Sequence, residues 1–150
     1  MRRSASADPY GVAVTWADLR IAGAVALGGA AGALARWSIA LAIPWNPPDV
    51  PWATLLANLV GCLAIGALLT WWTEGSPPPW WVRPLVAVGF VGGFTTFSAF
   101  AVEGVLLVEA GAPGVAAGYV VGSVAAGLLL VRGSAVAMRW MLRPDRGGAR

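Results

Sequence analysis

Apolar residues form four long runs along the chain, separated by polar, proline-rich or very short segments. The runs cover residues 19–43, 52–72, 80–109 and 114–131, and the apolar pattern of the last extends past Arg132 towards residue 141. About 20 apolar residues are enough for a helix to cross the roughly 30 Å hydrocarbon core of a bilayer. The pattern therefore predicts an all-α membrane protein with four transmembrane helices.

The polar segments divide the chain into a central domain and two ends. PWNPPDVP (44–51) and TEGSPPP (73–79) are rich in proline and are expected to be loops. We predict a flexible N-terminal extension at 1–17, a four-helix transmembrane domain at 18–142 and a polar tail at 143–150. No apolar stretch directly follows the N-terminal arginine pair, which argues against a cleaved signal peptide.

The composition agrees with a chain that meets lipid. Hydrophobic residues make up 58% and charged residues 11%, whereas soluble domains carry about 25% charged residues. All ten cationic side chains are arginine, and they lie at the flanks of apolar runs rather than on an aromatic-rich basic face. That distribution argues against a nucleic-acid partner.

Arginines gather on one predicted side of the membrane, which suggests an orientation. Four helices place both termini on the same side, and that side carries nine of the ten arginines: Arg2, Arg3, Arg20, Arg83, Arg132, Arg139, Arg143, Arg146 and Arg150. We expect a multi-pass protein of a bacterial plasma membrane, and the positive-inside rule favours both termini in the cytoplasm.

Several kinds of chemistry are excluded by the residues available. There is no histidine, and Cys62 is the only cysteine, so neither a disulfide nor a thiolate or imidazole metal site can form within the chain. Cys62 is expected to be a small packing residue. There is no P-loop or catalytic triad, so we expect no enzyme.

The third run contains GFVGGFTTFSAF (89–100), a poor sequence for a continuous helix. Glycines and threonines at Gly92–Thr95 predict an interruption, and carbonyls released at membrane depth can be satisfied by a bound cation. Phe97 and Phe100 are three residues apart on one face of the following helix. The two rings can fill the core, but their edges also carry partial positive charge and can face an anion.

Other polar residues inside the apolar runs have two readings each. Asn58 is either a hydrogen bond between helices or an amide donor in a pathway. Arg36 either reaches the headgroups or holds a positive charge at the mouth of an anion route. Glu103 either pairs with an arginine or reaches the interface, and Tyr119 and Ser123 either pack or offer hydroxyls.

Together these residues are hydrogen-bond donors without a buried acid. No carboxylate lies in 19–43 or 52–72, so a proton-coupled transporter of the small dual-topology multidrug type lacks its essential group. A non-transporting assembly subunit would leave the joint placement of Asn58, Phe97 and Phe100 unexplained. The donors suit a small, strongly hydrated anion.

The chain resembles the Fluc/CrcB family of fluoride channels. GFVGGFTTFSAFAVE (89–103) is similar to the family pattern G-x-x-G-G-x-T-T-F-S-T-F, and TLLANLVG (54–61) to T-x-x-x-N-x-x-G. GGAAGALARW (28–37) supports the match. The resemblance implies an antiparallel, dual-topology dimer with two fluoride pathways, one on each side of a central structural Na⁺, through which fluoride leaves the cell.

The resemblance also implies roles for particular residues. Na⁺ would be held at the interruption, by Gly92 and Thr95. The fluoride pathway would be lined by Asn58, Thr96, Phe97, Ser98, Phe100, Tyr119 and Ser123, with Arg36 near a vestibule.

Two features depart from the family pattern. Ala99 replaces a hydroxyl residue, for which we expect a modest effect. The arginine bias is strong for a chain that would insert both ways up, so the second subunit is either another copy or a paralogue of opposite orientation.

Overall fold

The computed structural model describes residues 15–143, and every regular element in that range is a helix. The elements are α1 (Trp16–Ala42), α2 (Trp52–Glu74), η1 (Arg83–Val91), α3 (Gly92–Phe94), α4 (Phe97–Glu109) and α5 (Pro113–Leu142). Four segments are long and apolar enough to cross a membrane: α1, α2, the run from η1 to α4, and α5. The predicted all-α fold with four spans is confirmed. The predicted N-terminal extension and C-terminal tail lie almost wholly outside the described residues.

The start of α1 is determined by a capping box. Thr15 Oγ1 accepts the N–H of Asp18 (3.3 Å), and the Asp18 carboxylate accepts the N–H of Thr15 (2.9 Å). Two N–H groups that the first helical turn cannot pair internally are thus satisfied. The helix therefore begins at Trp16, three residues before the apolar run that starts at residue 19.

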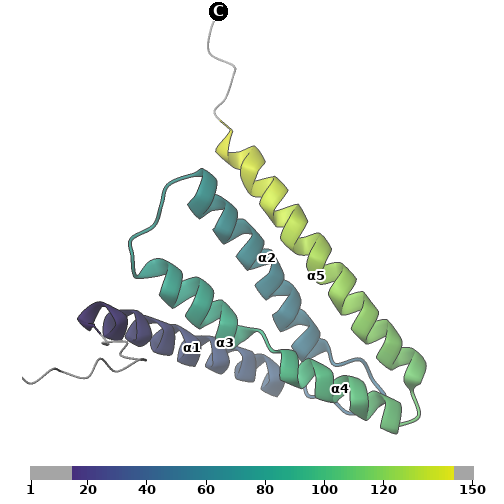
Figure 1. The fold of residues 1–150 in the computed structure, drawn as a ribbon. Coiled ribbons are helices and arrows are strands. Elements are labelled where there is room, and N and C mark those ends of the chain that lie inside the picture. Colours follow the sequence, from purple (N-terminus) through teal and green to yellow (C-terminus); the bar gives the residue numbers. More distant parts are fainter. Residues whose placement is uncertain (1–14, 144–150) are drawn as a thin grey trace, which may run out of the picture.

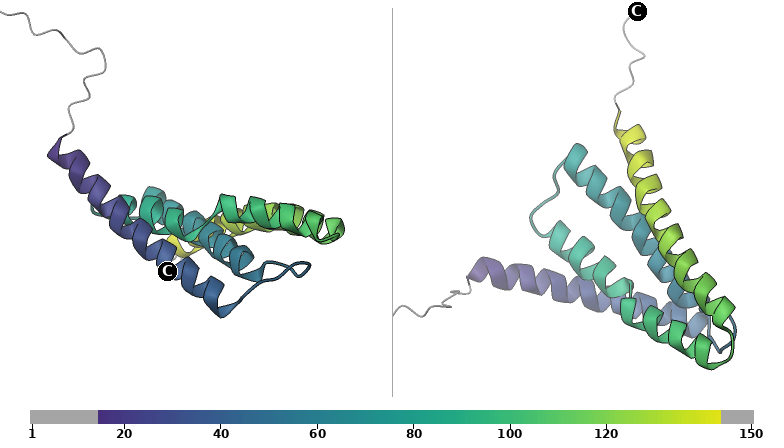
Figure 2. Two further views of the ribbon diagram at one scale, coloured as in Figure 1. Left: turned by 90° about the horizontal axis from the view of Figure 1, so that it is seen from below. Right: turned by 45° about the vertical axis from the view of Figure 1, so that its right-hand side comes forward.

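The helices form two pairs that spread like a fan. Helix α1 packs along η1 and α3, while α2 packs along α5. Figure 1 shows the pairs converging at the turn between α4 and α5 and separating towards the C-terminal ends of α2 and α5. From below, α2, α4 and α5 lie in one shallow layer (Figure 2). Only 11–33% of each span is buried within the chain, so most apolar surface is left for lipid or a second subunit.

Glycines allow the close contact between α1 and the η1–α3 segment. A Cβ on Gly28 would overlap the carbonyl oxygen of Leu85, and one on Gly32 would overlap that of Phe90. Gly93 faces the Gly29 backbone in the same way. Gly28 and Gly32 thus have the small-xxx-small spacing that allows two membrane helices to approach closely.

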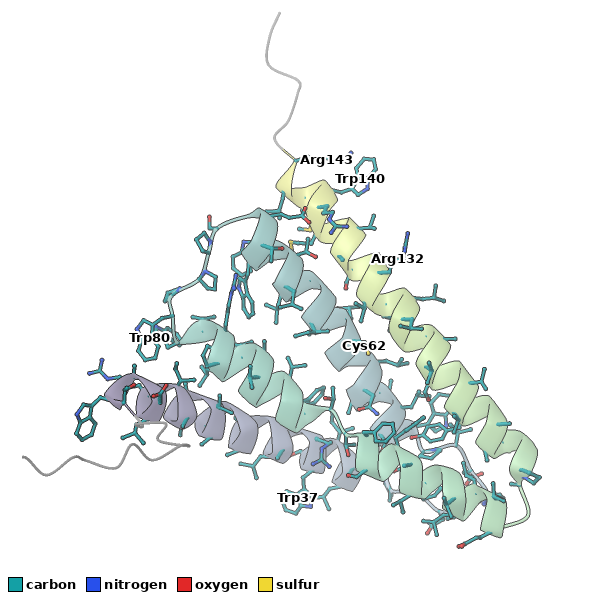
Figure 3. All side chains as sticks on the ribbon, in the orientation of Figure 1. Trp37, Cys62, Trp80, Arg132, Trp140 and Arg143 are labelled. Carbon is teal, nitrogen blue, oxygen red and sulfur yellow. The ribbon has the colours of Figure 1, made fainter. Side chains whose placement is uncertain are left out.

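Polar contacts tie the helices together at the end of the fan where α2 and α5 finish. Arg139 Nε lies 2.6 Å from Glu74 Oε1 in an exposed ion pair, and Arg83 donates to the Trp72 carbonyl (3.0 Å). Figure 3 shows Trp80, Trp140 and Arg143 near helix ends at that side, as in the aromatic belt of a membrane interface. This end carries most of the described arginines.

Candidate functional site

The backbone leaves the helical conformation at two adjacent threonines. Thr95 (φ −85°, ψ 158°) and Thr96 (φ −147°, ψ 128°) are extended, whereas Gly92 is helical. Thr96 Oγ1 accepts the Ala99 N–H (3.2 Å) and so caps α4. The non-helical residues therefore lie at the end of the Gly92–Thr95 segment where the sequence predicts an interruption, not at its glycines.

The side chain of Asn58 holds this region from α2. Its Oδ1 accepts the Thr96 N–H (2.8 Å), and its Nδ2 donates to the Thr96 carbonyl (2.9 Å). The amide thus pairs with both backbone polar groups of Thr96, and for the N–H it replaces the bond that a continuous helix would supply. The reading of Asn58 as a bond between helices is correct, and one of the two Nδ2 protons is left over for another acceptor.

The same contact releases a carbonyl of α3. In a continuous α-helix the Thr96 N–H would bond to the Gly92 carbonyl four residues earlier, but here it bonds to Asn58. A Cβ on Gly92 would meet nothing within 4 Å, in contrast to Gly93, which packs on α1. Open space therefore lies on the side of Gly92 where a side chain would point.

Phe97 and Phe100 form the aromatic part of the site at the start of α4. Their ring centroids are 6.0 Å apart with the planes inclined by 44°, and Phe100 also lies 5.2 Å from the Tyr119 ring. Phe97 is 81% exposed, an unusual state for a phenylalanine that only fills core. Its ring is available to an ion, to lipid or to a second subunit.

These groups line one open depression of about 480 Å³ between α2, α5 and the η1–α4 segment. Seven of the ten residues predicted for the pathway and cation site are among its lining: Asn58, Gly92, Thr95, Thr96, Phe97, Phe100 and Ser123. Its walls are mostly apolar, with hydroxyl, amide and backbone groups at the break. Among residues 15–143, no charged side chain lines it.

The other three predicted residues lie outside the depression. Arg36 donates from Nε to the Gly93 carbonyl (3.3 Å), against the backbone of α3. Ser98 is exposed, with Oγ 3.3 Å from Thr96 Oγ1. Tyr119 is buried and donates to the Glu103 carboxyl group (2.7 Å).

A polar cluster beside the depression was only partly foreseen. Glu103 accepts from Tyr119 at Oε2 and from Thr54 Oγ1 at Oε1 (2.6 Å), so the reading in which it pairs with an arginine is wrong. The cluster joins α2, α4 and α5 behind Phe100. Glu103 stands out as a carboxylate three residues after Phe100 in an apolar run, but Thr54 gave no comparable signal.

The described residues offer no cluster of histidine, cysteine and carboxylate side chains for a metal ion. Cys62 is half-buried between α2 and α5, with its sulfur 3.2 Å from where a Cβ of Gly127 would lie. It also contributes to the lining of the depression. Its role is in packing, as the sequence predicts.

Comparison with known sequences agrees with this site. Residues 23–135 match the family model described as CrcB-like protein, Camphor Resistance (CrcB). The chain belongs to the CrcB family. The match covers two spans of this CrcB-family chain completely and most of α1 and α5, and it includes every residue of the depression.

Named relatives of this CrcB-family chain cover most of its length. "Fluoride-specific ion channel FluC 2" of Nocardia farcinica is 44% identical over 117 residues, covering 78% of this chain and 84% of the relative. "Fluoride-specific ion channel FluC" of Pseudomonas aeruginosa is 43% identical over 121 residues, covering 79% and 94%. "Fluoride-specific ion channel FluC 1" of Mycobacterium tuberculosis is 44% identical over 123 residues, covering 81% and 92%. The resemblance is confirmed, as is the prediction of a multi-pass membrane protein that is not an enzyme.

Proposed function

We propose that this chain is a subunit of a fluoride-selective channel that lets cytoplasmic fluoride leave the cell passively and so protects against fluoride toxicity. The relatives named as fluoride-specific channels support the ion. The observation that carries the proposal is the depression at the Thr95–Thr96 break, where an amide, hydroxyls and two phenylalanine rings meet within an apolar span.

The groups of the depression match the needs of a small anion. Asn58 has one amide proton left after its bond to Thr96. Thr96 Oγ1 accepts the Ala99 N–H, so its own proton is left to donate to Ser98 or to an anion. The edges of Phe97 and Phe100 add weak positive potential without a fixed charge that would trap the ion. Such donors replace the hydration shell of the anion while still allowing the anion to leave the site.

The driving force requires no coupling machinery. A negative membrane potential expels a monovalent anion with about 2.3 kcal/mol per 100 mV. In an acidic medium, fluoride enters cells as neutral HF. The HF dissociates inside, and the fluoride anion can then leave down this gradient. A passive pore is sufficient for protection.

A second subunit would complete the pathway. The depression is open and the spans are largely exposed, so we propose an antiparallel dimer with two pores, made with another copy or with a paralogue. Arg20, Arg83, Arg139 and Arg143 lie at the end of the spans that we assign to the cytoplasm, as do the start of α1 and the end of α5. This arginine bias favours one insertion direction for the chain. An antiparallel dimer then requires a partner that inserts in the opposite direction.

We also propose a structural Na⁺ on the axis of that dimer, held at Gly92 and Thr95. The residues fit the ion, because Gly92 presents a carbonyl that has lost its helical donor and a face that nothing else occupies. Thr95 adds a hydroxyl whose proton goes to the Val91 carbonyl (2.9 Å), leaving lone pairs on Oγ1. Oxygen ligands of this kind suit a hard cation.

Fluoride efflux from liposomes tests the function. Purified chain should release fluoride, but not chloride, when valinomycin and K⁺ set the potential. Efflux only after a paralogue is added would establish a heterodimer, and no efflux with any partner would contradict the channel.

The phenylalanines can be tested in the same assay. Phe97→Ile and Phe100→Ile should abolish transport while the dimer persists by size-exclusion chromatography, because isoleucine fills similar space without an electropositive edge. Normal conduction by both variants would refute the role of the rings.

A further inference from the structure

A second hollow adjoins the depression on the side of the C-terminal end of α5. This hollow of about 590 Å³ follows α5 beside α2, and its lining shares Cys62, Ser123 and Val124 with the depression. The shared residues place the two hollows next to each other along α5, and the two together are called the groove. The further α5 residues of the lining, such as Gly127 and Val131, recur at helical spacing along one face.

A charged residue lines the groove near its far end. Arg132 lines the second hollow and is the only charged residue among the described residues that line either part. Its side chain is exposed, and within residues 15–143 it takes part in no ion pair, whereas Arg139 pairs with Glu74. Figure 3 shows Arg132 further along α5 than the level of Cys62.

The position of Arg132 suits recruitment rather than binding. It lies nine residues after Ser123 on α5, or about 14 Å along the axis at ~1.5 Å per residue. A positive charge at the mouth of a groove with apolar walls focuses its field along the groove and raises the local concentration of anions. At that distance it does not hold the ion in the pathway itself.

We propose that Arg132 recruits the anion at the cytoplasmic end of the pathway. The anion then enters the groove along α5 and passes Ser123 to reach the depression. This inference rests on the proposed channel function. The competing explanation is an arginine that only reaches the lipid headgroups, and that role predicts no effect on transport.

Screening distinguishes the two roles. The Debye length is about 30 Å at 0.01 M salt and about 3 Å at 1 M, so a charge ~14 Å from the depression acts at low salt and is screened at high salt. Arg132→Gln should lower the initial fluoride efflux rate from liposomes roughly threefold to tenfold in low-salt buffer, at the lower end of measured steering effects. At high concentrations of an impermeant salt the variant and the wild type should converge.

Two further variants serve as controls. Arg139→Gln removes the same charge from the same helix two turns further on, outside the groove, and should leave the rate within twofold of wild type. Arg132→Lys keeps the charge and should restore the rate and its salt dependence. A loss that is equal in Arg132→Gln and Arg132→Lys would mean a packing role and would overturn the inference.

The outcomes separate this inference from the function on which it rests. Wild-type efflux with an unaffected Arg132→Gln variant at low salt would overturn the inference alone. A wild-type chain that conducts no fluoride with any partner would overturn the channel function and, with it, the recruitment.

Discussion

Replacing Asn58 by alanine tests whether one side chain maintains the extended threonines. The substitution removes two hydrogen bonds, of 2.8 and 2.9 Å, and leaves the Thr96 N–H and carbonyl without those partners. A hydrogen bond contributes about 0.5–1.5 kcal/mol net, and an abandoned polar group costs about 1–3 kcal/mol. Thr96 is half-buried and borders an open depression, so water can recover part of the loss. We expect Asn58→Ala to lower the free energy of unfolding by about 2–3 kcal/mol.

SDS-induced unfolding in mixed micelles, followed by circular dichroism and tryptophan fluorescence, measures this difference. The matched control is Thr70→Val on the same helix, since Thr70 is buried but its hydroxyl donates to the Gly66 carbonyl of its own helix (2.8 Å) rather than to another helix. That variant should stay within about 0.5 kcal/mol of wild type, because its helix keeps its backbone bonds. If Asn58→Ala destabilises no more than Thr70→Val, the proposed role of the Asn58 amide is refuted.

Two further substitutions test the packing and the polar cluster by the same unfolding measurement. Gly32→Ala should destabilise the protein by about 1–3 kcal/mol, because its Cβ would overlap the Phe90 carbonyl oxygen. In the control Gly23→Ala, the new Cβ meets nothing within 4 Å, and the change should be neutral or stabilising by up to ~1 kcal/mol. Similar values for both variants would disprove the close contact. Tyr119→Phe removes one of the two side-chain donors to Glu103 and should cost about 1–3 kcal/mol, and an unchanged stability would show that this bond is not formed in the membrane.

The spans were predictable because each depends on a local property of the chain. An apolar run of 20 or more residues is sufficient to place a transmembrane helix, and α2 coincides with its predicted run to within two residues at each end. The start of α1 differed from the start of its apolar run because Thr15 and Asp18 cap the helix through side-chain hydrogen bonds. Hydropathy does not register such bonds.

The site was predictable only as a set of residue types. Phe97 and Phe100 are close in sequence, so their shared face followed from helical spacing. The partners of Asn58 and Glu103 lie 38 and up to 49 residues away, and such pairings depend on how the helices cross. Arg132 was assigned only to a membrane flank, because nothing local shows that a groove connects it to Ser123.

The central claim, a passive pore selective for fluoride, is tested most directly by the reversal potential of the purified channel in a planar bilayer. For a fluoride-selective pore it should move by about 59 mV for each tenfold change in the fluoride gradient, the value for a single charge, and should not respond to chloride. A reversal potential that follows the chloride or the proton gradient would contradict the account.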